Sequence, residues 1–198
     1  MAFEDTQITI NDLSFNIEGK TLLHNTNLSL NRNGITVLLG ANGAGKTIFL
    51  KLLTGLLTPS SGSTTFQSGN LSIKTSAFVS QEPVILRRTV LKNMLFVLEK
   101  ITSEKSTLAK ELLSLMGLDK KEYQNALTLS AGEKQRLCLA RAIITDPEIL
   151  LLDEPTANIE PNSTTLIEKY LIQKVRSSRK IFFVTHDINQ ARRLADEI

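Results

Sequence analysis

The spacing of hydrophobic positions changes along the chain, and each spacing predicts a different kind of element. Up to about Leu30 apolar and polar residues alternate, and the turn Glu18-Gly19-Lys20 divides this stretch, which predicts a small antiparallel sheet. The next stretch predicts a helix at Thr47–Leu57 and strands at Ser63–Phe66 and Ala77–Val79.

Apolar residues in the middle of the chain follow a helical period. Two sets each fall on one helical face, and Gly117 ends the second. The sets are Val90, Leu91, Met94, Leu95, Leu98 and Ile101, followed by Leu108, Leu112, Leu115 and Met116. We therefore expect a helical subdomain, roughly Pro83–Leu129, inserted into an α/β core.

The last third of the chain alternates between helical and strand patterns. The predicted elements are helices at Ala131–Thr145, Asn162–Arg176 and Ile188–Ala195, with strands at Glu148–Leu152 and Ile181–Thr185. Such alternation favours right-handed crossovers and a parallel sheet. We expect residues 1–198 to form a single α/β domain.

Composition changes this picture little. The 198 residues are 41% apolar and 22% charged, as in an ordinary globular protein, and the net charge of +3 permits nucleic acid binding without implying it. No apolar run reaches about 18 residues, and Glu4 and Asp5 occupy the region where a leader would be basic. The chain is not expected to enter or span a membrane by itself.

A glycine-rich segment between a strand and a helix carries the strongest chemical signal. Gly40–Thr47 reads Gly-Ala-Asn-Gly-Ala-Gly-Lys-Thr, the pattern of a phosphate-binding loop. Backbone N–H groups and the helix dipole would converge on a polyphosphate, Lys46 would contact the outer phosphates, and the Thr47 hydroxyl would bind Mg²⁺. The expected nucleotide contacts in this loop are Gly40, Asn42, Gly43, Ala44, Gly45, Lys46 and Thr47. The alternative is an ordinary glycine-rich turn.

Two carboxylates follow an apolar run at Ile149–Glu154, as expected where a buried parallel strand ends at a ligand crevice. Asp153 would hold Mg²⁺ through water, and Glu154 would polarise the water that attacks the γ-phosphate. A polar loop after a strand is the structural alternative.

Three further positions have both a structural and a functional interpretation. Ser130 with Glu133 forms a capping box, and the same helix start could receive a phosphate; spacing does not separate the two. His186 follows a predicted strand and could bond the γ-phosphate, or it is a structural histidine. Gln81 stands at the entry to the helical subdomain and could contact the metal or its water, or lie on the surface.

Taken together, these residues resemble the nucleotide-binding subunit of an ABC transporter, from about Ile8 to the chain end. The ordered motifs are Gly40–Thr47 (Walker A), Gln81 (Q-loop), Leu129–Glu133 (signature), Ile149–Glu154 (Walker B and catalytic Glu), Ala157–Glu160 (D-loop) and His186 (H-loop). By this resemblance Phe15 stacks on the adenine of ATP, although a strand Phe is also an ordinary core residue.

The resemblance implies a P-loop ATPase with ATP and Mg²⁺ as cofactors. Two subunits would pack head to tail, so that Ser130 and Gly132 of one enclose the ATP held by Lys46 of the other. The dimer would drive ABC permease membrane subunits from the cytoplasmic face of the cell membrane, with an extracytoplasmic solute-binding protein in the system and no nucleic acid partner.

Four positions depart from the family pattern. Ala131 replaces a usual glycine, which would carry a penalty if its φ were positive, Glu133 replaces Gln, and Glu160 replaces Asp. The family generally continues with further strands beyond Ile198, so a shortened C-terminus is expected.

Residues 80–90, 156–158 and 190–196 are similar to ATPase subunits of tungstate and related oxyanion importers. The sequence leaves three alternatives: an exporter ATPase, a soluble ABC ATPase acting on ribosomes or nucleic acid, and a nucleotide-gated module without turnover. Glu154 argues against the last of these.

Overall fold

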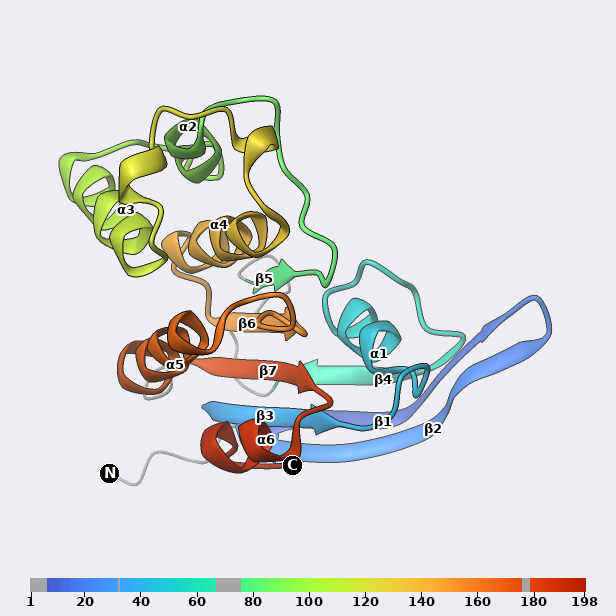
Figure 1. The fold of residues 1–198 in the computed structure, drawn as a ribbon. Coiled ribbons are helices and arrows are strands. Elements are labelled where there is room, and N and C mark those ends of the chain that lie inside the picture. The colour runs from blue at the N-terminus through green and yellow to red at the C-terminus, as the bar shows by residue number, and fades with distance from the viewer. Residues whose placement is uncertain (1–6, 32, 67–75, 176–178) are drawn as a thin grey trace, which may run out of the picture.

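Two sheets and a group of helices make up the chain in the computed structural model, which describes residues 7–31, 33–66, 76–175 and 179–198 (Figure 1). One sheet is antiparallel and has the strand order β2-β1-β4, and the other is parallel with the order β3-β7-β6-β5. The predicted fold class, an α/β core with a small antiparallel sheet and a helical subdomain, is confirmed.

The antiparallel sheet consists of β1 (Gln7–Ile17), β2 (Lys20–Asn31) and β4 (Ser61–Phe66). The two residues between β1 and β2, Glu18 and Gly19, both have positive φ, at 49° and 75°. A two-residue turn of this kind matches the twist of paired strands, and it explains why the hairpin bends where the sequence predicts.

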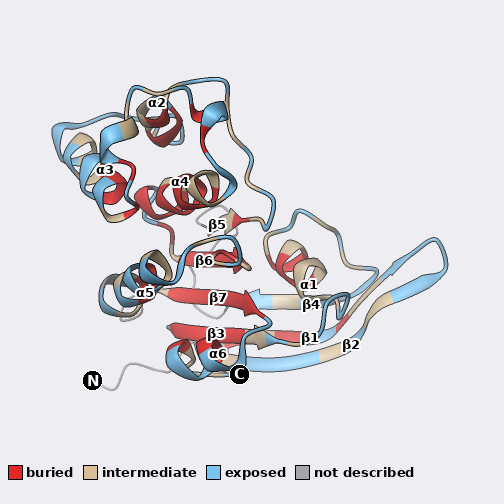
Figure 2. Cartoon of the chain, viewed as in Figure 1, coloured by how far each residue is buried: buried red, intermediate tan, exposed pale blue. Residues whose placement is uncertain are grey.

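The parallel sheet consists of β3 (Gly34–Leu39), β7 (Lys180–Thr185), β6 (Ile149–Asp153) and β5 (Ser76–Val79). Every residue of β6 and β7 is buried, as Figure 2 shows. These strands therefore have continuous apolar runs instead of the alternation found in β1.

A separate apolar core lies on each face of the parallel sheet. Phe182 packs with β1 and the helix α1 (Lys46–Leu53), and its ring meets that of Phe49 edge to face, with centroids 6.5 Å apart. The next residue, Phe183, packs with the helical side. The alternation of side chains along a strand thus assigns neighbouring residues to opposite cores.

The helix α1 ends at Leu53, earlier than the predicted Leu57. Gly55 adopts φ 68° just beyond the last turn, and its N–H donates to the Leu52 carbonyl. A glycine in the left-handed region ends a helix, so the apolar residues that follow, such as the exposed Leu56, lie outside it.

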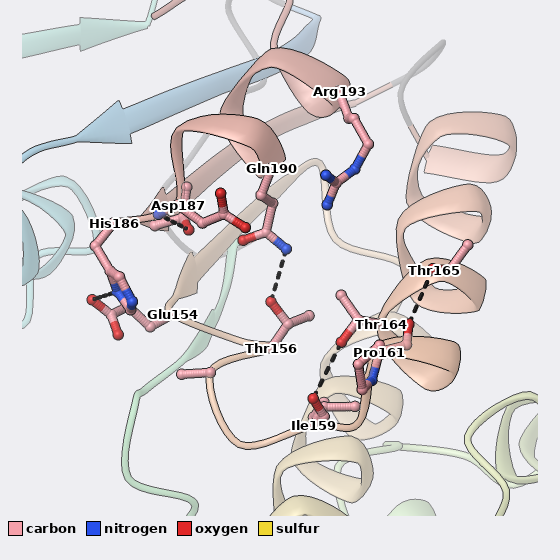
Figure 3. Close-up of a pocket in the computed structure, with 12 residues that line it drawn as sticks. Glu154, Thr156, Ile159, Pro161, Thr164, Thr165, His186, Asp187, Gln190 and Arg193 are labelled. Carbon is pink, nitrogen blue, oxygen red and sulfur yellow. Dashed lines mark hydrogen bonds and ion pairs between the residues drawn. The ribbon is translucent and has the colours of Figure 1, made fainter.

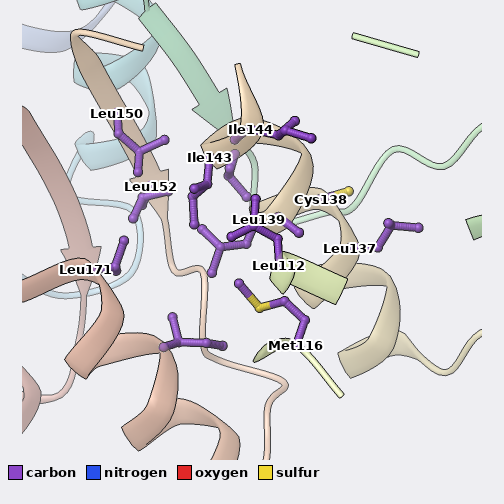
Figure 4. Packing of buried hydrophobic residues seen from close by; sticks show 14 of the residues in the cluster. Leu112, Met116, Leu137, Cys138, Leu139, Ile143, Ile144, Leu150, Leu152 and Leu171 are labelled. Atoms are coloured by element: carbon purple, nitrogen blue, oxygen red, sulfur yellow. The ribbon is translucent and has the colours of Figure 1, made fainter. Parts of the chain in front are cut away.

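The helical subdomain contains α2 (Val90–Leu95), α3 (Ser103–Leu115) and two short 3₁₀ turns at Asp119–Lys121 and Ala126–Thr128. The helix α4 (Ala131–Ile144) packs against both α2 and α3 and connects them to the sheet. Figure 4 shows Ile143 of this helix beside Leu152 of β6.

The chain closes with α5 (Pro161–Tyr170), a π-helical segment Leu171–Val175, β7 and α6 (Ile188–Leu194). The last residues pair with β3, because the Val37 N–H donates to the Glu197 carbonyl at 2.9 Å. The Glu197 carboxylate also accepts hydrogen bonds of 2.7 Å from Thr36 and from the buried Lys180. No helix in the described ranges is both long and apolar enough to cross a membrane.

Candidate nucleotide site

The glycine-rich loop lies at the carboxyl end of β3 and leads directly into α1. Gly43 and Gly45 have φ of 81° and 85°, a conformation that L side chains rarely adopt. A Cβ at Gly45 would also lie only 3.0 Å from the Leu22 carbonyl oxygen. Both glycines are therefore required by the backbone geometry, which turns successive N–H groups toward the start of the helix.

Lys46 lies over this loop. Its Nζ donates hydrogen bonds of 2.7 Å to the Gly40 carbonyl and 2.9 Å to the Ala41 carbonyl. The ammonium group is thus held beside the loop that would surround phosphate oxygens, where it would meet their negative charge.

A cavity of about 360 Å³ brings most of the predicted site residues together. It is lined by the phosphate loop, by Gln81 after β5, by Asp153 at the end of β6 and by Glu154 directly after it. The lining residues are Asn42, Gly43, Ala44, Gly45, Lys46, Thr47, Ile48, Gln81, Asp153, Glu154 and Val184. The carboxyl ends of the parallel strands lie along this edge of the sheet, which explains how positions more than 100 residues apart line one cavity.

Asp153 and Thr47 are paired at the floor of the site. The Thr47 hydroxyl donates to Asp153 Oδ2 at 2.7 Å, and Asp153 is only 2% exposed. Burial raises the pKa of Asp153, the Thr47 hydrogen bond lowers it, and the nearby charge of Glu154 raises it further. A buried carboxylate bonded to a hydroxyl, with the Gln81 amide on the wall of the same cavity, is an oxygen donor set that fits Mg²⁺.

Glu154 and His186 face each other across the ends of β6 and β7. His186 Nδ1 lies 3.3 Å from Glu154 Oε1, and Figure 3 shows the two side chains in contact. The Glu154 side chain is 11% exposed, whereas that of His186 is 62% exposed. Glu154 also has φ 47°, a strained value for a residue with a side chain.

The predicted capping box at Ser130 is present. The Ser130 hydroxyl accepts from the Glu133 N–H at 3.3 Å, and a Glu133 carboxylate oxygen accepts from the Ser130 N–H at 2.9 Å. Lys121 Nζ lies 2.5 Å from Glu133 and holds its pKa below the usual value, together with the Ser130 hydrogen bond. Ser130 does not line the 360 Å³ cavity, and its contact with nucleotide stays a prediction.

The departure at Ala131 carries no backbone penalty. Ala131 is the first residue of α4, and it is not among the described residues with positive φ. The expected strain would have required a left-handed conformation, which the helix start does not have.

Gly132 packs closely against another segment of its own chain, the predicted D-loop. A Cβ at this position would lie 2.4 Å from the carbonyl oxygen of Asn158 in the predicted D-loop. Close by, Arg136 Nη1 lies 2.7 Å from both carboxylate oxygens of Glu160. The start of α4 is thereby fixed to the D-loop, a contact for which the sequence has no local signal.

Phe15 lies in β1 opposite Leu23 of β2, partly buried against the core that contains α1. It is not among the residues that line the 360 Å³ cavity, so its stacking on adenine stays a prediction.

An apolar groove that sequence reasoning missed lies beside the Gln81 segment, between β5, α4 and the start of the helical subdomain. It has a volume of about 460 Å³, and Val84 and Phe96 on its walls are 66% and 53% exposed. The guanidinium carbon of Arg88 lies 4.7 Å from the centre of the Phe96 ring. Exposed apolar residues gathered around a groove are typical of a protein-binding surface.

A glycine-rich loop at the carboxyl edge of a parallel sheet, with a lysine above it and two carboxylates at the end of β6, two strands away in the sheet, defines a P-loop nucleotide-binding protein. The sequence profile of the family described as "ABC transporter" matches residues 23–157. The chain therefore belongs to the ABC transporter family, and it is an ATP-binding subunit whose ATP hydrolysis is coupled to transport.

Individual relatives agree with this assignment. Tungstate uptake system ATP-binding protein TupC of Peptoclostridium acidaminophilum is 35% identical, over 97% of this chain and 92% of that protein. Aliphatic sulfonates import ATP-binding protein SsuB 1 of Nocardia farcinica is 36% identical, over 100% of this chain and 79% of that protein. Among solved structures, cbiO1 from Clostridium perfringens, part of the ABC transporter complex cbiONQ, is 28% identical with a TM-score of 0.75. The match covers 93% of this chain and 80% of that chain.

Proposed function

We propose that the chain hydrolyses Mg-ATP at the 360 Å³ cavity and thereby energises the import of a small oxyanion. The observation that carries this proposal is the shared lining of that cavity by Lys46, Thr47, Gln81, Asp153 and Glu154. These residues offer a cation for phosphates, oxygen donors for a metal and a carboxylate for water within one space.

Each side chain has a distinct role in this proposal. Lys46 and the loop N–H groups would bind the phosphates, and Thr47, Asp153 and Gln81 would hold Mg²⁺, whose charge would offset that of the phosphates. Glu154 orients and polarises the attacking water, because it lies at the strand end beside the phosphate loop.

His186 would bond the γ-phosphate from the neighbouring strand end. It does not line the 360 Å³ cavity itself, but its Nδ1 lies 3.3 Å from Oε1 of Glu154, which does. The imidazole is 62% exposed, so it remains accessible to a substrate phosphate. Phe15 would stack on the adenine from β1.

The active form in this proposal is a head-to-tail homodimer. Ser130 and Gly132 of one subunit would face the γ-phosphate bound to the other, which is consistent with the exposure of Ser130 at the positive end of the α4 dipole. ATP would then be part of the interface, and its hydrolysis would release the contact.

The permease would dock in the 460 Å³ groove. A cytoplasmic helix with apolar side chains fits the exposed Val84 and Phe96, and Gln81 lies on the segment that leads from the cavity to this groove. Contact with the permease would hold the chain at the cytoplasmic face of the membrane. Val84→Asp is expected to abolish co-purification with a multispanning protein while ATP binding persists.

Tungstate is the first candidate solute, because TupC is matched over 92% of its length at 35% identity. SsuB 1 is equally similar and is named for sulfonates, so the shared class is the tetrahedral oxyanion. A strain without this chain should lose accumulation of tungstate, with sulfonate uptake measured in parallel. A solute-binding protein would supply the specificity, since the solute does not reach this subunit.

Glu154→Gln tests the catalytic assignment. The variant should bind Mg-ATP and accumulate as an ATP-bound dimer on size exclusion, with turnover lowered by a factor of about 10² to 10³. Lys46→Ala is the comparison variant, because it should lose nucleotide affinity instead. Normal turnover by Glu154→Gln would refute the assignment.

A further inference from the structure

Gln190 of α6 is a buried amide with both of its N–H groups used. It is 5% exposed, and its Nε2 donates one hydrogen bond of 2.9 Å to Thr156 Oγ1 and another of 2.9 Å to Glu168 Oε1. Figure 3 shows the amide reaching from α6 to Thr156 in a second pocket of about 330 Å³, which both residues line together with Glu154 and His186. A buried amide satisfied on both hydrogens has one favourable orientation, so it fixes the distance between the groups it joins.

Glu168 of α5 anchors this amide. Glu168 is 5% exposed, and its carboxylate also accepts hydrogen bonds from Arg193 Nε at 3.0 Å and Arg193 Nη2 at 2.9 Å. This two-bond pairing raises the pKa of Arg193 and compensates the buried negative charge. Glu168 is therefore a rigid acceptor that holds Gln190 against α5.

The two ends of the network lie next to the proposed catalytic pair. Thr156 is two residues after Glu154, in a turn closed by a 3.2 Å hydrogen bond from the Ala157 N–H to the Glu154 carbonyl. Gln190 is four residues after His186, on the first turn of the helix that His186 precedes. One side chain thus connects the turn that carries the strained Glu154 to the helix that positions His186.

We propose that Gln190 is a positioning residue for ATP hydrolysis, which keeps Glu154 and His186 in register through its bonds to Thr156 and Glu168. A strained φ persists only where its surroundings fix it, and this amide holds the end of the turn in which Glu154 lies. Loss of the bridge would let the turn and α6 shift apart, and shifts of about 1 Å in catalytic geometry are costly in rate.

The test compares steady-state hydrolysis of Mg-ATP by the full chain and its variants. Gln190→Met keeps the length and volume of the side chain but removes both donors, and Thr156→Val removes the acceptor. Each should lower kcat about tenfold with KM changed less than about twofold, since only orientation for the chemical step is lost. The double variant should be no slower than the slower single variant, because both break one bridge.

Two comparison variants separate positioning from stability. Thr156→Ser keeps the hydroxyl and should retain kcat, and Asn189→Ala changes an exposed side chain on the same helix turn and should leave kcat unchanged. Thermal unfolding of each variant shows whether it is folded at the assay temperature. If Gln190→Met fails to fold, the comparison of Thr156→Val with Thr156→Ser tests the positioning role by itself.

Wild-type kcat in Gln190→Met or Thr156→Val would overturn the inference, and so would equal losses in Thr156→Ser and Thr156→Val. The inference rests on the proposed function of Glu154, and the two can fail separately. Normal turnover by Glu154→Gln would refute the catalytic assignment of Glu154. Normal kcat in Gln190→Met, together with an inactive Glu154→Gln, would refute only the positioning role of Gln190.

Discussion

Replacing Gly132 by alanine tests how closely the start of α4 packs against the D-loop. The added Cβ would lie 2.4 Å from the Asn158 carbonyl oxygen and 3.6 Å from its carbonyl carbon. The oxygen contact is about 1 Å shorter than ordinary van der Waals separation, and the opposing atom belongs to the backbone, so no side-chain rotation relieves it. Either the D-loop or the first turn of α4 has to move.

The cost follows from two opposing effects. Overpacking of a tight contact costs about 1–3 kcal/mol, while alanine gains up to about 1 kcal/mol over glycine in a helix. The net destabilisation of Gly132→Ala is therefore about 1–2 kcal/mol. For a chain of this length each kcal/mol corresponds to about 2–4 °C, so Tm should fall by roughly 2–8 °C.

Urea and thermal unfolding of wild type and variant measure this difference. Ala131→Gly is the matched control, because it removes one methyl group from the neighbouring exposed position and measures the helix-propensity contribution alone. A Tm for Gly132→Ala equal to or above that of the wild type would refute the packing argument. The glycine would then be explained by nucleotide binding only.

Two ion pairs give further predictions. Lys121→Gln should lower the unfolding free energy at pH 7 by up to about 1 kcal/mol, because the pair with Glu133 is partly exposed. The pKa of Glu133 is depressed in the folded state, so this contribution is complete above the unfolded pKa and disappears as pH falls through the lower folded pKa. Urea unfolding measured from pH 7 to pH 3 should show the unfolding free energies of wild type and Lys121→Gln converging. A difference that stays constant over this range would contradict a contribution from the pair of Lys121 with Glu133. Glu197→Gln should lower the unfolding free energy by about 3 kcal/mol, because Lys180 is 1% exposed and would lose the carboxylate that pairs with it. A decrease below about 1 kcal/mol in urea unfolding would contradict this prediction.

Features that depend on a few neighbouring residues could be predicted from the sequence. The Gly40–Thr47 loop and the Ser130–Glu133 capping box are local patterns, and the structure has both in the expected context. The order of strands and helices was also predictable, since the pattern of β6 and β7 shows burial on both faces. The end of α1 was not, because the apolar residues beyond Gly55 continue a helical pattern that the backbone of this glycine interrupts.

Contacts between distant segments had no signal in the sequence. The approach of Asn158 to Gly132 and the bridge from Gln190 to Thr156 depend on how α4, α5 and α6 pack on the sheet. Each partner taken alone is an ordinary loop or helix residue. Tertiary packing decides these contacts, so a pattern of single residues does not predict them.

The longer side chain at Glu160, where aspartate is usual, has a role in this packing. Its carboxylate accepts from Arg136 Nη1 at 2.7 Å and from the Ser163 hydroxyl at 2.8 Å, so it joins α4 to the first turn of α5. Arg136 is buried while Glu160 is 57% exposed, so the pair anchors an otherwise costly buried cation. Together with the close approach of Gly132 to Asn158, this pair joins α4 to the D-loop. A displacement of the helical subdomain is therefore expected to reach the turn that carries Glu154, and a permease docked in the 460 Å³ groove as proposed would act on the site of hydrolysis through these contacts.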